Sequence, residues 1–177
     1  GFMCHLNLSA PMWKNKEGHI TIIGAGGASR AIMWSFLKEN KTDIRLVNRS
    51  EERGLKLIKD MKKLFPLSKI HFSSDLSEAL INCSILVNCS SLGMSGQPKL
   101  KLNIESMNKD SIVYDIVYTP LVTELLHDAK RLNYTAIDGL GMLLNQAVPA
   151  FEMWHHRKVK VSESLKKIAL AHLEGVK

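Results

Sequence analysis

Short apolar runs alternate along most of this chain with segments in which apolar residues recur every three to four positions. The short runs predict strands at residues 19–23, 44–48, 69–72, 85–88, 112–115 and 134–137. Such alternation is typical of a parallel sheet with helices on both faces. We therefore predict an α/β fold, a doubly wound parallel sheet of the Rossmann type.

The helical segments carry apolar stripes. One stripe comprises Leu57, Met61, Leu64 and Phe65, and another comprises Val122, Leu125, Leu126, Ala129 and Leu132. After the last strand, residues 140–154 predict an apolar helix that Pro149 should kink. A second terminal helix is expected to start with Ser162 as its cap. Neither terminal helix has a further strand to cover.

The composition excludes several classes of protein. The chain has 177 residues and 45% hydrophobic content, and no apolar run approaches the length that spans a membrane. The start lacks the regions of a signal peptide. Three cysteines form no CxxC pair, which favours a reducing cytoplasm, and no set of His, Cys and carboxylate residues has the spacing of metal ligands.

A net charge of +7 raises the question of nucleic acid. The basic residues gather around residues 38–69 and near the C-terminus, without interleaved aromatic residues or a nucleic-acid motif. An anionic cofactor explains the charge more simply. We expect no nucleic-acid partner and no membrane partner.

The first predicted strand runs into a cluster of glycines, and a helical pattern follows at once. Gly24 permits a tight turn, Gly26 lets the backbone approach a phosphate, and the new helix offers unpaired N–H groups to an anion. Ser29 replaces the third glycine of the usual fingerprint and is small enough for close helix–strand packing. The segment predicts a dinucleotide pyrophosphate site, with a simple turn as the alternative.

The end of the second predicted strand distinguishes two cofactors. An acidic residue there would bind the ribose 2′-hydroxyl of NAD, whereas this chain has Asn48 and Arg49, with Arg53 four residues on. Guanidinium groups bind a 2′-phosphate through charge-assisted, forked hydrogen bonds. The pattern favours NADP over NAD, and the alternative is two solvated surface arginines.

Three further segments place polar groups at the carboxyl edge of the sheet. Residues 88–94 offer hydroxyls and amides suited to a ribose or nicotinamide, or else form a polar turn. Tyr118 follows the fifth strand, where its hydroxyl either enters the crevice or is buried at the edge. Met142 and Gln146 share one helix face, for a nicotinamide ring and a sugar-like hydroxyl, or as a core Met and a solvated Gln.

Together these segments resemble the cofactor-binding half of the shikimate dehydrogenase family, over nearly the whole chain. The matching motifs are residues 24–31, 48–50 with Arg53, 88–94, 115–120 with Thr123, and 139–147 with Phe151 and Trp154. The resemblance implies the NADP-dependent interconversion of 3-dehydroshikimate and shikimate in chorismate and aromatic amino-acid biosynthesis.

The resemblance also implies roles for individual residues. The pyrophosphate would contact Gly24, Ala25, Gly26, Gly27 and Ala28, and the 2′-phosphate end would contact Asn48, Arg49, Ser50 and Arg53. The ribose and nicotinamide would lie along Ser90, Ile116, Gly139 and Met142, and the substrate would meet Tyr118 and Gln146.

In this family a preceding domain carries a catalytic Lys and an Asp in an Asn-Thr-Asp motif, followed by a pair like Gly1-Phe2. No segment here resembles that domain. We therefore expect a fragment without catalytic residues, inactive by itself. The expected organisation is an NADP-binding domain at 1–154 and a helical segment at 155–177, which packs on the absent domain or, through apolar helices, on a second copy.

Three alternatives stay open. A quinate-accepting dehydrogenase of the same family and a non-catalytic NADP-binding module share these features. The reductase that acts on glutamyl-tRNA also pairs a glycine loop with an Asn-Arg motif, but it gives no reason for residues 139–146.

Overall fold

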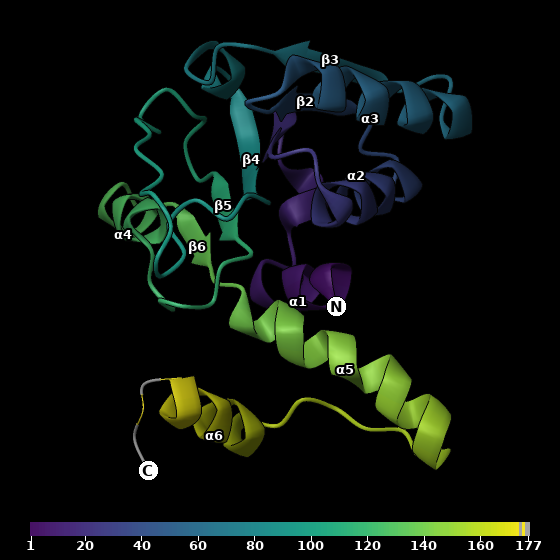
Figure 1. Cartoon of the computed structure of the whole chain (residues 1–177), viewed down its shortest axis with the longest axis vertical. Helices are drawn as coiled ribbons and strands as arrows, with labels where there is room; N and C mark the ends of the chain where they lie inside the picture. The colour runs from purple at the N-terminus through teal and green to yellow at the C-terminus, as the bar shows by residue number, and fades with distance from the viewer. Residues whose placement is uncertain (174, 176–177) are drawn as a thin grey trace.

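The computed structural model describes residues 1–173 and 175 and contains one sheet of six parallel strands (Figure 1). The strands are β1 His19–Ile23, β2 Asp43–Val47, β3 Lys69–Ser73, β4 Cys83–Asn88, β5 Ile112–Asp115 and β6 Thr135–Ile137. Their order across the sheet is β3-β2-β1-β4-β5-β6, so the chain starts in the middle, fills one side, and then crosses to the other. The doubly wound fold is confirmed, and each predicted strand is found within two residues of its expected bounds.

In the described part of the chain, six α-helices and two short 3-10 helices precede, connect or follow the strands. The α-helices are α1 Phe2–Ser9, α2 Gly27–Lys38, α3 Glu51–Leu64, α4 Glu124–Arg131, α5 Leu140–His155 and α6 Glu163–Leu173, and the 3-10 helices are η1 Trp13–Asn15 and η2 Glu78–Leu80. Ser50 and Thr123 cap α3 and α4 by accepting backbone hydrogen bonds. Ser162 accepts one from the Leu165 amide at 3.1 Å, which confirms the predicted start of α6. Helix α5 continues through Pro149.

The apolar core forms two layers, one on each face of the sheet. On one face Ile20 and Ile22 of β1 pack with residues of α1, α2 and α3. On the other face the core includes Ile23 and residues of α4. The connection from β4 to β5 has no helix, and buried side chains of its irregular chain pack there instead: Leu100, Ile104 and Met107.

Each of the two predicted apolar stripes contains one residue that is wrong. In α3 the side chains of Leu57 and Met61 are buried and Phe65 packs against the core, but Leu64, in the last turn, is exposed. Val122 is also exposed, since α4 begins only after the Thr123 cap. The other predicted members of both stripes are buried or packed against the core.

Helix α1 was not predicted, and it changes the environment of α5. Phe2 and Leu6 of α1 are buried, and α1 packs against both α2 and α5 (Figure 1). His5 joins it to the sheet through a 2.7 Å hydrogen bond between its Nδ1 atom and the Tyr114 hydroxyl. A Cβ atom on Gly141 of α5 would lie 2.0 Å from Nε2 of His5, so only glycine fits there. The first half of α5 therefore has a partner within the chain.

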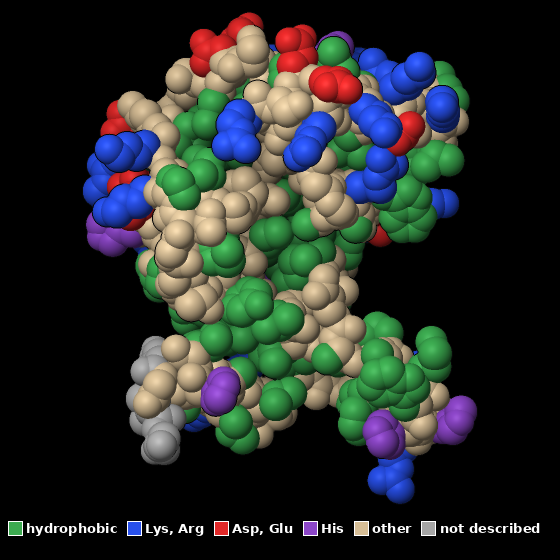
Figure 2. Space-filling view, viewed as in Figure 1, with side chains coloured by type: hydrophobic (Ala, Val, Ile, Leu, Met, Phe, Trp, Pro, Cys, Tyr) green, Lys and Arg blue, Asp and Glu red, His purple; other side chains and the backbone are tan. Residues whose placement is uncertain are grey.

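The end of α5 and the following helix leave several large apolar side chains exposed. We call this set the terminal apolar surface: Phe151, Met153, Trp154, Leu165 and Ile168. Each of these side chains is exposed, and α6 has no buried residue. Figure 2 shows hydrophobic side chains gathered at the end of α5. Residues 174 and 176–177 of the predicted terminal segment lie outside the described residues.

Candidate nucleotide-binding site

The carboxyl ends of β1, β2 and β4 surround a hollow of about 350 Å³. Four of the residues singled out from the sequence line it, one or two from each of the three strand ends: Gly24, Asn48, Arg49 and Ser90. Because β1 and β4 are the pair at which the strand order reverses, this is the position where doubly wound sheets bind their ligands. We call it the switch-point hollow.

Gly24 is required by the fold itself. Its φ is +103°, and its amide donates to the Val47 carbonyl at 2.7 Å. A Cβ atom there would lie 3.1 Å from the Cys89 carbonyl oxygen, in a backbone conformation that L side chains rarely adopt. Gly24 thus brings the ends of β1, β2 and β4 close together.

Gly26 and Gly27 have no such requirement. Gly26 has φ −94°, and no heavy atom lies within 4 Å of a Cβ atom built at either position. The N-terminus of α2, which starts here, has no side-chain cap, so its first amides keep their capacity for an anion. A bound pyrophosphate would explain both the small residues and the open space, so these residues fit the group.

The end of β2 is ordered by its own side chains. The Asn48 Nδ2 atom donates to the Ser50 carbonyl at 2.7 Å, and the Ser50 hydroxyl accepts from the Arg53 amide at 3.4 Å. Arg49 and Arg53 are exposed, and neither makes an ion pair with a residue in the described part of the chain. This holds although two acidic residues, Glu51 and Glu52, begin α3 close by. Two guanidinium groups therefore remain available for an anion.

Arg30, by contrast, is already engaged. Its guanidinium pairs with the Asp60 carboxylate of α3 at 2.7 Å and holds the pKa of that carboxyl below its ordinary value. Figure 2 shows the Lys and Arg side chains that surround this part of the surface. The positive charge near the switch-point hollow is thus only partly neutralised.

After β4 the chain turns on a buried amide. The Asn88 Oδ1 atom accepts from the Ser90 amide at 3.1 Å and from the Ser90 hydroxyl at 2.7 Å. The Ser90 hydroxyl in turn accepts from the Leu92 amide at 3.2 Å. These bonds hold Ser90 at the rim of the switch-point hollow.

The ends of β5 and β6 meet at Ile116 and Gly139. A Cβ atom on Gly139 would lie 2.1 Å from the Ile116 carbonyl oxygen, and the Gly139 amide donates to the Val117 carbonyl at 3.2 Å. Tyr118, two residues after Ile116, has an exposed side chain, so the alternative of a buried edge tyrosine is wrong.

A second hollow of about 490 Å³ lies between α1, α2 and α5. Met142 and Gln146 line it from one face of α5, opposite Gly27 and Ala28 at the start of α2. Met142 is half-buried against the core and Gln146 is exposed. The structure thus brings this pair to the glycine loop, while their exposure also agrees with a core Met and a solvated Gln.

Sequence reasoning missed the role of Asp115, a buried residue beside the site. Asp115, at the end of β5, accepts hydrogen bonds from the side chains of Asn88 and Thr123. Burial raises the pKa of its carboxyl, and no cation pairs with it in the described chain. The sequence signal was available, because an acidic residue ends an otherwise apolar strand.

The described residues contain no group of three or more His, Cys, Asp or Glu side chains that could hold a metal ion. None of the described helices has both the length and the apolar character that a membrane span needs.

The fold and the switch-point hollow define a Rossmann-type domain. Two family models match the chain, "Shikimate / quinate 5-dehydrogenase" over residues 9–143 and "Shikimate 5'-dehydrogenase C-terminal domain" over residues 139–163. The chain belongs to the shikimate/quinate dehydrogenase family, which confirms the resemblance found in the sequence.

Known relatives are longer than this chain. A shikimate dehydrogenase (NADP(+)) of Paramagnetospirillum magneticum is 40% identical over 171 residues, which cover 97% of this chain and 61% of the relative. Shikimate dehydrogenase from Aquifex aeolicus has a similar structure, with a TM-score of 0.74 and 30% identity over 99% of this chain and 58% of that one. Quinate dehydrogenase from Corynebacterium glutamicum, in complex with NAD, shares the fold with a TM-score of 0.84 and 23% identity over 96% and 60%. The chain therefore spans about three fifths of the length of these proteins.

Proposed function

We propose that this chain is the NADP-binding half of a shikimate dehydrogenase, which reduces 3-dehydroshikimate reversibly to shikimate. The observation that carries the proposal is the switch-point hollow, where a glycine turn, a polar loop and Arg49 meet. Family membership supports the reaction class, and the curated relatives are named for NADP. The bound cofactor would supply the hydride.

Each part of the site has a proposed task toward the cofactor. The residues of the glycine loop hold the pyrophosphate: Gly24, Ala25, Gly26, Gly27 and Ala28. The end of β2 holds the 2′-phosphate with Asn48, Arg49, Ser50 and Arg53. The remaining cofactor contacts, along ribose and nicotinamide, are Ser90, Ile116, Gly139 and Met142.

Tyr118 and Gln146 are proposed to contact the substrate. We place the catalytic Lys and Asp implied by the family resemblance outside these residues, so the isolated chain should not form NADPH from shikimate. Hydride transfer to a ketone needs a proton donor at the developing alkoxide. Turnover by a pure sample of these 177 residues would show that the donor lies within the chain.

We propose that the terminal apolar surface packs on the substrate domain of the parent protein. Exposed apolar patches of more than a few hundred Å² are uncommon in monomers. Light scattering of this chain at several concentrations tests the alternative, a homodimer through the same helices.

We also propose that the protein works in a reducing cytoplasm, as its three cysteines without a CxxC pair suggest.

The cofactor assignment is tested by calorimetric titration with NADPH and NADH. NADPH should bind more tightly, and Arg49→Ala should weaken NADPH binding by roughly 1.5–3 kcal/mol, the scale of a hydrogen bond to a charged group. Arg157→Ala, at an exposed arginine outside the site, is the control for the change in net charge. Equal affinity for the two cofactors would contradict the proposal.

The alternatives are a quinate dehydrogenase and a non-catalytic module. The description of the matching family model names both shikimate and quinate, so both substrates stay open. Comparing shikimate with quinate as the substrate of the parent enzyme separates these two. A chain that binds NADPH and whose parent reduces neither ketone would be a non-catalytic module.

A further inference from the structure

A continuous set of buried and part-buried hydrogen bonds links the start of α4 to the switch-point hollow. At one end the Thr123 hydroxyl accepts from the Leu126 amide at 3.3 Å, which caps α4. The same hydroxyl donates to the Asp115 Oδ2 atom at 2.7 Å. Thr123 therefore makes one more bond than a helix cap requires.

Asp115 is the centre of this network. Its Oδ1 atom accepts from the Asn88 Nδ2 atom at 2.9 Å and from the Val117 amide at 3.1 Å. The carboxylate thus joins the end of β4, its own strand β5 and the cap of α4. Asp115 is fully buried, so each of these donors would lose its partner without access to water if the carboxylate moved.

Asn88 connects Asp115 to the residues that line the switch-point hollow. Its Nδ2 atom, engaged by Asp115, also donates to the Leu92 carbonyl at 3.2 Å, while its Oδ1 atom holds Ser90. The partners fix both ends of the amide, so Asn88 has a single favourable orientation. Ser90 and Leu92 line the switch-point hollow, whereas Thr123 does not.

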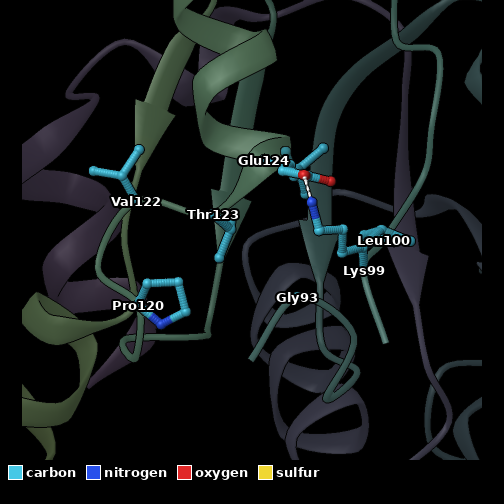
Figure 3. A pocket seen from close by; sticks show the side chains of 8 residues that line it. Gly93, Lys99, Leu100, Pro120, Val122, Thr123 and Glu124 are labelled. Carbon is cyan, nitrogen blue, oxygen red and sulfur yellow. Dashed lines mark hydrogen bonds and ion pairs between the residues drawn. The ribbon is translucent and has the colours of Figure 1, made fainter. Parts of the chain in front are cut away.

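Figure 3 shows the other side of the network. There Thr123 and Glu124 line a small hollow of about 150 Å³ with Gly93 and Lys99, and Glu124 pairs with Lys99. A Cβ atom on Gly93 would lie 3.7 Å from the Thr123 Cβ atom, so the loop after β4 passes close to the cap of α4. The two loops are also joined by a 2.8 Å hydrogen bond from the Ser95 amide to the Thr119 carbonyl.

We propose that Thr123 and Asp115 are positioning residues for cofactor binding, which hold Ser90 and its loop in place through Asn88. This inference rests on the proposed function, since it assigns the network to that same site. The hydroxyl of Thr123 restrains the loop without lining the hollow.

The test compares Thr123→Val, which removes the hydroxyl and keeps the shape, with Thr123→Ser, which keeps the hydroxyl. Glu124→Gln is the matched control, because it removes the neighbouring ion pair with Lys99 at the same helix end. Calorimetric titration of the full chain should show an NADPH Kd raised roughly fivefold in Thr123→Val, the equivalent of one hydrogen bond, and nearly unchanged in the other two.

Amide hydrogen exchange of the cofactor-free chain gives a second readout. Residues 88–92 should exchange faster in Thr123→Val and at the wild-type rate in Thr123→Ser, while strand β1 stays protected in both. Unchanged exchange at 88–92 would overturn the inference, as would faster exchange with an unchanged NADPH Kd. A wild-type chain that binds no NADPH would instead refute the proposed function, and the positioning role with it.

Discussion

Replacing Gly26 by alanine tests whether the open space at the start of α2 serves a ligand or the fold. A methyl group at Gly26 meets no protein atom within 4 Å, and its φ of −94° suits any residue. Gly24, two residues earlier, is the matched comparison, because its φ is +103° and its Cβ atom would press on the Cys89 carbonyl. Both changes add one methyl group to the same loop.

The structure predicts different costs for the two variants. Gly26 is the N-cap residue of α2, and neither glycine nor alanine has a side chain that can accept a hydrogen bond there. Gly26→Ala should therefore change the free energy of unfolding by less than about 1 kcal/mol. Gly24→Ala forces a rarely populated backbone conformation, at a cost of about 1–3 kcal/mol. For a chain of this size 1 kcal/mol corresponds to roughly 2–4 °C in Tm.

Cofactor binding should respond differently from stability. A methyl group that crowds a bound pyrophosphate costs about 1–3 kcal/mol, by analogy with overpacking, which raises the NADPH Kd roughly 5- to 150-fold. Thermal unfolding followed by circular dichroism and calorimetric titration measure the two effects separately. A Gly26→Ala chain that binds NADPH as tightly as the wild type would refute the pyrophosphate assignment.

Three further predictions concern buried groups. Burial lowers the pKa of His5 and of His19, so near pH 6.5 the unfolded chain binds protons that the folded chain does not bind. Urea titrations should therefore show a free energy of unfolding that is constant above this pH and falls below it. The fall should be less steep in His5→Gln. Gly141→Ala should lower the free energy of unfolding by about 1–3 kcal/mol in the same titration, since its methyl group would overlap the His5 ring. The control is Gly27→Ala, whose methyl group meets open space and should cost less than about 1 kcal/mol. Burial raises the pKa of Cys83 to about 11 and that of Cys89 to about 12, so at pH 8 an alkylating reagent should label the exposed Cys4 first. Mass spectrometry that finds Cys83 and Cys89 labelled as fast as Cys4 would contradict this.

The sheet was predictable because each strand is a short apolar run between turn residues. The turn after β1 was also predictable, because glycine is the residue that most readily adopts a positive φ. Gly24 has a positive φ in the structure. Some of the proposed cofactor residues could be placed together from their order along the chain, because parallel strands bring their carboxyl ends to one edge of the sheet. The switch-point hollow brings four of them together as that rule requires.

Helix α1 was not predictable in the same way. It has no side-chain cap and no acidic residue in its first turn, and its exposed Leu8 weakens the apolar periodicity. Its stability comes from tertiary partners far along the sequence, among them Tyr114, which lies 109 residues from His5. Local periodicity cannot report such a contact.

The same limit explains why the sequence did not divide the motif residues by their roles. Gly24 and Gly26 belong to one loop, yet only Gly24 is required by its contacts within the chain. Asp115 and Tyr118 belong to one strand end, yet Asp115 is buried and hydrogen-bonded within the chain whereas Tyr118 is exposed. A small or polar residue that the fold does not need is the stronger pointer to a ligand, because folding offers no other reason for it. By this criterion the cofactor proposal depends on the open glycines and on Arg49, which has no ion-pair partner among the residues described, and variants at these positions should lose binding without losing stability.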